Sequence, residues 1–520
     1  MATPINMHWA DVIAKDVVDN CDSPLIATGI SPTGILHVGS LREAITGESV
    51  RSAVEAAGKE VRLIYLIDDF DPLRKRYPFL PEEYEKYVGM PICRIPCPCG
   101  KHNNYAHHFV QPFLDTIETL GMKCEIIWTH ELYEKGLFAE CIDAAMTKRE
   151  RVIEILHEVT GKEADPNYAP FNPLCSKCGR FCRPKFDTYS FPHIEYECTC
   201  GNKGVANITK GEGKLTWRLE WPAKWKIFGT SAEPFGKDHA AAGGSYDSGK
   251  IIMEEIYGGK APFPIPYEFV QLKGVGQMHK SLGSPVTGLD AINMMPPEVL
   301  NYLFLRVNPS KSIDFDPGLG VLDMADEYDR MEKLYFSGEW TESEDNSVAA
   351  YKIAQHNMIP KKLPLQVSCR HLVNVVQMAS DFDEVLTILK RTMDLSEATM
   401  DDMERLKRRV NSVRYWLNGF APDSVKFSIR QTIPTSVTLT MNDKLFFQAL
   451  ISRLNDAPWD VDTINKVFNE VAKSMPIGSK GAYKAMYKIL IAKEAGPRLA
   501  LFLASMDKKF VINRLIQASN

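Results

Sequence analysis

A histidine and a glycine lie where a short apolar run gives way to a helix-like stretch. His37 and Gly39 belong to the loop 30–40, which precedes residues 41–57. A helix N-terminus offers free backbone N–H groups and the positive end of the helix dipole, so it attracts phosphate. Gly39 permits close approach of the backbone, and His37 can donate a hydrogen bond to charge that develops on a phosphate. The spacing alone fits an ordinary loop histidine in a Gly/Pro turn about equally well.

The surrounding pattern predicts a strand, a loop, a helix and a second strand. Residues 24–28 are a short apolar run, 41–57 are rich in alanine and end before Gly58, and 61–67 are apolar apart from Arg62. A continuously apolar run is typical of a strand in a buried parallel sheet, and glycine favours the end of a helix. This is the start of a doubly wound α/β fold, whose ligands bind beyond the carboxyl ends of the strands.

Eight of the twelve cysteines fall in two short clusters, and this spacing favours metal binding in a reducing compartment over disulfides. The second cluster predicts a structural zinc site with four thiolate ligands, Cys175, Cys178, Cys198 and Cys200. Cys182 is a spare thiol that could replace one of them. The sequence leaves open whether a second metal binds to the earlier group Cys93, Cys97, Cys99 and His102.

The composition indicates a soluble protein with several domains. With 520 residues and 45% hydrophobic content, the chain can build roughly three domains. The first twenty residues lack the pattern of a signal peptide, and no apolar run approaches the roughly 20 residues that span a bilayer, so we expect a cytoplasmic protein without a membrane partner. A net charge of −5 excludes a globally basic nucleic-acid binder but permits a local basic face.

The loop at residues 32–40, PTGILHVGS, resembles the HIGH motif of class I aminoacyl-tRNA synthetases. Residues 41–44, 66–75 and 234–246 are similar to the lysyl members of that class rather than to glutamyl or arginyl members. Weaker similarity continues through 314–318 to 496–498 and 510–512. The chain thus resembles the class I lysyl-tRNA synthetases over nearly its whole length.

The resemblance implies a Rossmann-like doubly wound catalytic domain with an inserted zinc-containing domain and an α-helical C-terminal domain. The boundaries that we expect are 1–93 and 215–290 for the two catalytic halves, 94–214 for the insertion, 291–350 for a connecting region that contacts the tRNA stem, and 351–520 for the anticodon-binding domain. In 404–417, basic residues share a helix with Tyr415 and Trp416, which suit RNA phosphates and unpaired bases. Composition alone favours a solvated helix face there.

The same resemblance implies attachment of lysine to tRNA(Lys) through a lysyl-adenylate, by a monomeric enzyme that uses ATP and Mg²⁺. A lysine pocket needs a carboxylate for the ε-ammonium group and aromatic walls along the methylenes. The residues that the resemblance assigns to lysine are Gly29, Ser31, Glu43, Trp217, His239 and Tyr267. Those that it assigns to ATP are Pro32, Gly34, His37, Gly39, Met278, Lys280 and Ser281, and the catalytic group is His37, Gly39, Ser40 and Lys280.

The second phosphate-binding loop departs from the family pattern. The family places a lysine just before the closing glycine of a KMSKS-type loop, where this chain has Leu282, with Lys280 two residues earlier. A cationic loop stabilises the charge that builds as pyrophosphate leaves. Two alternatives to the lysine enzyme therefore stay open: a catalytically weak paralogue that binds tRNA, and a class I synthetase for another amino acid.

Overall fold

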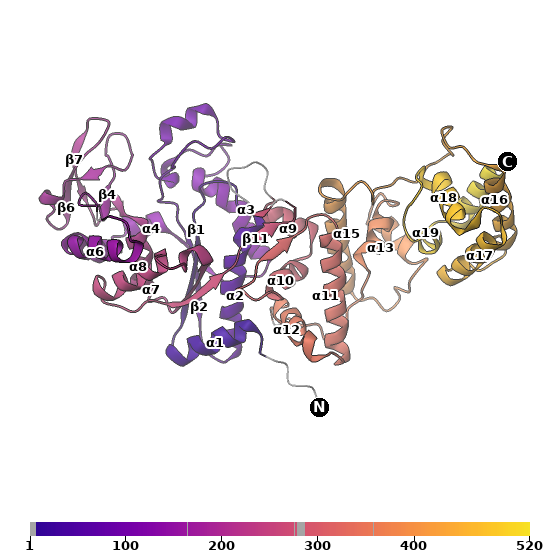
Figure 1. Ribbon diagram of the computed structural model, residues 1–520, viewed down its shortest axis with the longest axis horizontal. Helices are drawn as coiled ribbons and strands as arrows, with labels where there is room; N and C mark the ends of the chain where they lie inside the picture. Colours follow the sequence, from indigo (N-terminus) through magenta and orange to yellow (C-terminus); the bar gives the residue numbers. More distant parts are fainter. Residues whose placement is uncertain (1–6, 164, 275, 278–285, 357) are drawn as a thin grey trace. The chain divides into compact units, whose positions relative to one another are not determined.

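The computed structural model describes residues 7–163, 165–274, 276–277, 286–356 and 358–520. The chain divides into two compact units. The first unit comprises Met1–Ile292, Pro297–Asp316 and Leu334–Ile359, and the second comprises Asn293–Pro296, Pro317–Lys333 and Pro360–Asn520. Figure 1 traces both along the chain.

A five-stranded sheet with only parallel pairings forms the centre of the first unit. Its order is β10-β9-β1-β2-β3, and the bounds are Leu25–Ile30 (β1), Arg62–Ile67 (β2), Glu125–Trp128 (β3), Ala232–Gly236 (β9) and Phe263–Tyr267 (β10). The chain runs outward from β1 through β2 and β3 on one side and continues with β9 and β10 on the other. The topology therefore switches direction at β1, where doubly wound sheets bind their ligands.

The first two strands and the helix between them confirm the prediction of an α/β fold with a parallel sheet. β1 and β2 lie within two residues of the predicted runs, and they pair from Leu25 opposite Arg62 to Ile30 opposite Ile67. The helix α2 spans Leu41–Ala56. Gly58 follows it with a φ of +83°, a left-handed conformation that favours glycine at a helix end.

Helix α2 is buried along most of its length, because it packs against β1 and against the helices α1 (Trp9–Asn20) and α10 (Pro297–Leu305). Its polar side chains therefore need internal partners. Arg42 donates to the carbonyl oxygens of Phe304 and Asn308, both at 3.0 Å, and so satisfies the end of α10. These contacts fix the start of α2 and, with it, the loop that carries His37.

The chain between β2 and β9 adds helices and two small sheets. Although β3 falls inside the stretch 94–214 that was expected as an insertion, it pairs with β2, so this stretch contributes a strand to the central sheet. One small sheet consists of β4 and β8, and the other has the order β5-β6-β7. All pairings in both sheets are antiparallel. The bounds are Tyr105–Thr119 (α3), Thr129–Glu134 (α4), Ala139–Thr147 (α5), Arg149–Thr160 (α6), Phe171–Pro173 (β4), Arg183–Pro184 (β5), His193–Glu197 (β6), Lys203–Asn207 (β7) and Gly213–Leu215 (β8).

The first unit continues with further helices and a small sheet. Helix α7 precedes β9, α8 connects β9 to β10, and a small sheet of order β12-β11-β13 follows. The bounds are Trp217–Phe228 (α7), Ser245–Glu255 (α8), Val270–Leu272 (β11), Gly276–Gln277 (β12), Gly288–Met294 (α9), Ile313–Phe315 (β13) and Asp345–Ala354 (α12).

The described residues of the second unit form helices and irregular segments. The bounds are Gly320–Ser337 (α11, shared with the first unit), Cys369–Val376 (α13), Phe382–Leu389 (α14), Met400–Gly419 (α15), Met441–Leu454 (α16), Val461–Ser474 (α17), Gly478–Ile491 (α18), Leu499–Ser505 (α19) and Lys508–Ser519 (α20). The helices α16 to α20 enclose one apolar core, and Figure 1 shows α16 to α19 gathered near the C-terminus. No helix in the described part of the chain combines the length and apolar character needed to cross a membrane.

Helix α15 buries several side chains that were expected to face RNA. Arg405 pairs with Glu332 at 2.9 Å, and Arg409 pairs with Asp329, both on α11. The indole of Trp416 is fully buried and donates to backbone carbonyls at 2.9 and 3.1 Å. The expectation that these three side chains contact tRNA is wrong, because α11 already binds the two arginines and the backbone of Pro317 and Gly318 binds the indole.

Candidate active site

A cavity of about 630 Å³ opens at the carboxyl ends of β1, β2, β9 and β10. All the residues that were expected to contact lysine lie in its wall: Gly29, Ser31, Glu43, Trp217, His239 and Tyr267. They come from positions up to 238 residues apart in the chain. The fold therefore brings this predicted set together in one place.

Glu43 is held at the cavity wall by two hydrogen bonds. Its carboxylate accepts from the backbone N–H of Gly29 at 2.8 Å and from the hydroxyl of Tyr267 at 2.7 Å. Burial raises the pKa of Tyr267 well above its usual value of 10, and the charge of Glu43 raises it further, so the phenol keeps its proton and donates. A Cβ at Gly29 would lie 2.9 Å from the carbonyl oxygen of Leu66, so this edge of β1 needs glycine.

Two stacked indoles form the aromatic wall. Trp217 lies on Trp221 with ring centroids 5.6 Å apart and an interplanar angle of 10°. Trp221 is only 4% exposed, whereas Trp217 is 37% exposed. The His239 ring lies beside them, 5.4 Å from Trp221. Trp221 is thus a packing residue, while Trp217 leaves surface open to an aliphatic chain.

A buried network of charges supports the cavity from behind. Lys224 pairs with Asp68, and Lys214 pairs with Asp71 and, at 3.0 Å, with Glu220. Burial alone would lower the pKa of each lysine, but the neighbouring carboxylates outweigh it and raise both values above the usual one. Burial would likewise raise the pKa of Asp71, yet Lys214 holds it below its usual value. Lys214, Lys224 and Asp71 therefore stay charged at neutral pH.

Asp71 also positions Ser31, whose hydroxyl donates to it at 2.6 Å.

Glu233 is a buried acid in the cavity wall. Its carboxyl group accepts from the indole N–H of Trp221 at 2.9 Å and from that of Trp225. Burial nevertheless raises the pKa of Glu233 to about 8, so this group is mainly protonated at pH 7.

A second cavity of about 290 Å³ adjoins the first. His37, Gly39 and Ser40 line it, and it shares Gly29, Ser31, Glu43 and Tyr267 with the larger cavity. Residues Val38–Ser40 form a turn of 3₁₀ helix that runs directly into α2. A Cβ at Gly39 would lie 2.8 Å from Nδ1 of His37, so any larger residue would displace the imidazole. The two cavities can hold two ligands side by side.

The other residues predicted to bind ATP either lie outside both cavities or are not described by the structure. Pro32 and Gly34 belong to the same loop but line neither cavity. Gly34 packs against Phe79 instead, since a Cβ there would lie 3.2 Å from that ring. The remaining three, Met278, Lys280 and Ser281, lie outside the described residues, as does Leu282.

Comparison with known proteins adds the family to this geometry. Residues 7–357 match the family model described as tRNA synthetases class I (K). The chain belongs to this family of class I tRNA synthetases. Both cavities of this synthetase are lined by residues within the matched range.

Several proteins named as lysine–tRNA ligases are similar to the synthetase. The protein from Archaeoglobus fulgidus is 40% identical over 512 residues, which is 98% of this chain and 99% of that one. The protein from Thermoplasma volcanium is 40% identical over 509 residues, 98% of either chain. A solved glutamate tRNA ligase from Elizabethkingia meningosepticum covers 95% of this chain and 99% of its own at 11% identity, but its TM-score of 0.43 is too low to carry an argument.

No role was predicted from the sequence for four titratable residues of the synthetase's cavity, Asp68, Asp71, Lys224 and Glu233. A signal for the first two was available, because both follow β2 directly, at the edge where doubly wound sheets bind ligands. Lys224 lies in the tryptophan-rich helix α7, four residues after Glu220, and this spacing does not reveal its burial. Glu233 carried no such signal.

The four predicted zinc ligands of the synthetase gather in one place. The donor atoms of Cys175, Cys178, Cys198 and Cys200 all lie within 4.8 Å of one another. Cys175 and Cys200 have sulfurs 3.7 Å apart, and those of Cys178 and Cys198 are 3.5 Å apart. Tetrahedral Zn–S bonds of about 2.3 Å place sulfurs about 3.8 Å apart, so the donor set fits zinc. Cys182 is not part of this group.

The earlier cysteine cluster differs from the group considered in the sequence. Cys97, Cys99, His102 and His108 lie within 4.8 Å of one another, with His108 on α3 replacing Cys93. Cys93 lies instead with Asp69 and His130. Two thiols and two imidazoles in this spacing also suit a tetrahedral metal ion.

Proposed function

We propose that the synthetase attaches lysine to tRNA(Lys) through a lysyl-adenylate. The observation that carries this proposal is the larger cavity, in which Glu43 is fixed between Gly29 and Tyr267 with Trp217 beside it. A carboxylate suits the ε-ammonium group, and an open indole face suits the methylenes of lysine. The names of the similar proteins agree with this choice of amino acid.

The reaction needs positioning rather than a protein nucleophile. A carboxylate oxygen of lysine attacks the α-phosphorus of ATP, and the bond from that phosphorus to the bridging oxygen breaks as pyrophosphate leaves. A hydroxyl of the terminal ribose of tRNA then attacks the activated carbonyl, and AMP leaves. The two cavities share a wall, so the carboxylate of the substrate lysine in one lies next to the phosphates of ATP in the other. This arrangement supports the proposed order of steps. ATP enters with its Mg²⁺ as a substrate.

The roles of individual residues follow from their positions. His37, Gly39 and Ser40 bind the ATP phosphates at the start of α2, and Pro32 and Gly34 shape that loop. Ser31 and His239 contact the α-amino group and the adenylate. Met278, Lys280 and Ser281 bind ATP, and Lys280 stabilises the charge on the leaving pyrophosphate.

The test is amino-acid-dependent exchange of labelled pyrophosphate into ATP, run with each of the twenty amino acids, with and without tRNA. We expect lysine alone to support exchange, and Lys280→Ala to reduce it by roughly 100-fold or more, as for loss of one oxyanion-type contact. Exchange with glutamate or arginine would instead identify a different class I synthetase. Binding of tRNA without any exchange would point to the weak paralogue.

In this proposal the tRNA contacts divide between two stretches of the chain. Residues 291–350 contact the acceptor stem, and the helical part from 351 to 520 binds the anticodon. Exposed cations support the second role, among them Lys407 and Arg408 on α15. Phosphate contacts from such side chains supply most of the affinity for RNA.

We also propose that both cysteine clusters hold structural zinc. Metal analysis of the purified protein should find about two zinc ions per chain, one per four-ligand group. Cys198→Ser should lose one ion and His108→Ala the other, while Cys182→Ser, which removes a buried neighbouring thiol outside the ligand group, should keep both. Retention of two ions by Cys198→Ser would contradict the first site.

A further inference from the structure

Three acids follow β2, and their partners differ. Asp68 and Asp71 each pair with a buried lysine, which offsets their charge. Asp69 lies between them in the chain and is fully buried. Among the residues that the structure describes, it has no lysine or arginine partner, and its ion pair is with the imidazole of His130. Because a buried carboxylate needs a countercharge, the groups around Asp69 show what can supply it.

An imidazole and a thiol lie beside the carboxylate of Asp69. A hydrogen bond joins Nδ1 of His130 to one carboxylate oxygen, and the backbone N–H of His130 donates to the other oxygen at 3.0 Å. The sulfur of Cys93 completes the group, since the donor atoms of the three residues all lie within 4.8 Å of one another. The backbone N–H of Cys93 also donates to the carbonyl oxygen of Asp69 at 2.9 Å. Three different metal-binding side chains therefore converge.

These side chains come from three elements of the first unit. Asp69 lies two residues after the end of β2, Cys93 is the middle residue of a 3₁₀ turn at Ile92–Arg94, and His130 is the second residue of α4. The fold assembles the group, because 24 and 37 positions separate its members in the chain. The side chain of His130 is 23% exposed and Cys93 is half-buried, so an ion can reach the group from solvent.

The donor set suits zinc. Zinc takes thiolate sulfur, imidazole nitrogen and carboxylate oxygen as ligands, whereas calcium and magnesium prefer oxygen alone. Tetrahedral bonds of about 2.1 Å to nitrogen and oxygen and about 2.3 Å to sulfur place the donor atoms roughly 3.4–3.6 Å apart. Small rotations of the Cys93 and His130 side chains bring the group to that spacing. Because zinc binds the thiolate, its arrival releases the thiol proton to solvent.

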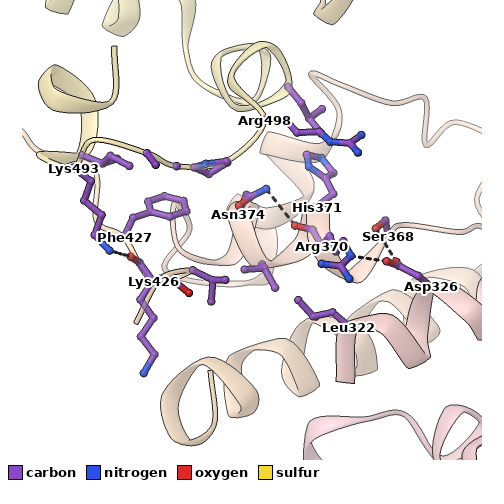
Figure 2. Close-up of a pocket in the computed structure, with 18 residues that line it drawn as sticks. Leu322, Asp326, Ser368, Arg370, His371, Asn374, Lys426, Phe427, Lys493 and Arg498 are labelled. Atoms are coloured by element: carbon purple, nitrogen blue, oxygen red, sulfur yellow. Dashed lines mark hydrogen bonds and ion pairs between the residues drawn. The ribbon is translucent and has the colours of Figure 1, made fainter. Parts of the chain in front are cut away.

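The second unit offers no comparable group among its described residues. A cavity of about 530 Å³ in that unit is lined by an imidazole, His371, and a carboxylate, Asp326. Figure 2 shows Asp326 turned toward Arg370 and Ser368, which donate to it at 2.6 and 3.4 Å. A guanidinium thus already supplies the countercharge, and this cavity does not call for a cation.

We propose that Asp69, Cys93 and His130 bind one Zn²⁺ ion, with a water molecule as the fourth ligand. Three protein ligands and an open position distinguish this site from the two cysteine clusters, which offer four ligands each. The ion gives Asp69 the countercharge that lysines give its neighbours. It also joins the end of β2 to α4 next to Asp68, which accepts from Thr129 at 2.8 Å and lines the amino-acid cavity.

The test measures zinc per chain after dialysis of the full-length protein against a series of buffered free-zinc concentrations. Dialysis restores an ion that three ligands release during purification. At saturation the wild type should bind one zinc ion more than Cys93→Ser, which keeps the size of the side chain but removes the thiolate. His130→Gln should weaken binding of this ion by roughly 100-fold or more, since even residues behind the ligands contribute 10- to 100-fold. Cys124→Ser removes a half-buried thiol outside all three groups and should bind like the wild type.

Cobalt identifies the sulfur ligand. Co²⁺ added to protein whose cysteine clusters keep their zinc should give a charge-transfer band from thiolate to metal in the wild type and in Cys124→Ser, but not in Cys93→Ser. Circular dichroism confirms that each variant is folded. Equal metal uptake by the wild type, Cys93→Ser and His130→Gln would overturn the proposal, and so would loss of the same ion in Cys124→Ser.

Metal uptake is measured without lysine, ATP or tRNA, so its result is independent of the proposed function. Each variant is compared with the wild type, and the ions in the two cysteine clusters therefore cancel. A protein that charges no tRNA, but loses one ion in Cys93→Ser, would refute the function and support the zinc site. A protein that charges tRNA with lysine, but binds zinc equally in both forms, would refute the zinc site alone.

Discussion

Glu43→Gln is expected to lower kcat/KM for lysine in pyrophosphate exchange by about 100- to 1000-fold, because losing one partner of a buried charged pair costs roughly 3–4 kcal/mol. Glutamine keeps the size of the side chain but removes the negative charge that faces the ε-ammonium group. It also replaces one of the two carboxylate oxygens with an NH2 group, although these oxygens now accept from Gly29 and Tyr267, one each. Most of the loss should appear as a higher KM for lysine, with the KM for ATP little changed.

Tyr267→Phe is the matched control for this experiment. It removes one hydrogen bond to Glu43 and leaves the charge, so it should cost only about tenfold, as for one hydrogen bond to a charged group. Equal losses in the two variants would show that the hydroxyl, and not the carboxylate, selects lysine. An unchanged KM for lysine in Glu43→Gln would contradict the assignment of Glu43 to the substrate.

Lys214→Met is expected to destabilise the first unit by about 3–5 kcal/mol, the usual cost of breaking a buried ion pair on one side. The change leaves Asp71 and Glu220 buried near each other without the ammonium group that now joins them. Unfolding in urea, followed by circular dichroism, measures this loss. Lys203→Met is the control, because its pair with Glu197 is exposed and its loss should leave the urea midpoint almost unchanged.

A triple variant separates the charge from the packing. Replacing Asp71 with Asn and Glu220 with Gln in the Lys214→Met background removes the uncompensated charges and should recover much of the stability. If Lys214→Met alone is as stable as the wild type, the network does not support the cavity. The raised pKa of Lys214 and the lowered pKa of Asp71 agree with a strong ion pair between these two residues.

The parts of the fold that the sequence predicted are those with local signals. The strands β1 and β2 and the helix α2 follow from apolar runs and a terminal glycine within about forty residues. The neighbours β9 and β10 could not be assigned in the same way, because they return to the sheet from some 170 residues further along. The boundary at residue 94 missed β3 because four residues with mixed burial give a weak pattern.

The residues of the candidate site likewise divide into those that could be predicted and those that could not. Glu43, Trp217 and Tyr267 were assigned through the family resemblance, whereas Lys214 and Lys224 were missed because lysine is ordinarily an exposed residue. Their burial depends on Asp71 and Asp68, more than 140 positions away, which no local pattern reveals. Arg405 and Arg409 were assigned to RNA because they are basic. No local pattern showed that their partners, Glu332 and Asp329, lie on α11. His108 was missed because it lies beyond the short cysteine run, one helical turn into α3.

The position of β1 in the sheet has a consequence for synthesis on the ribosome. β1 gains β2 as a neighbour early, but β9 joins its other side only after Gly236 has been translated and has left the exit tunnel. Until then the nascent chain carries a central strand with an open edge, which is prone to pair with other chains. We expect this interval to be the one in which the protein depends most on chaperones, since the walls of the amino-acid cavity are incomplete until β10 follows.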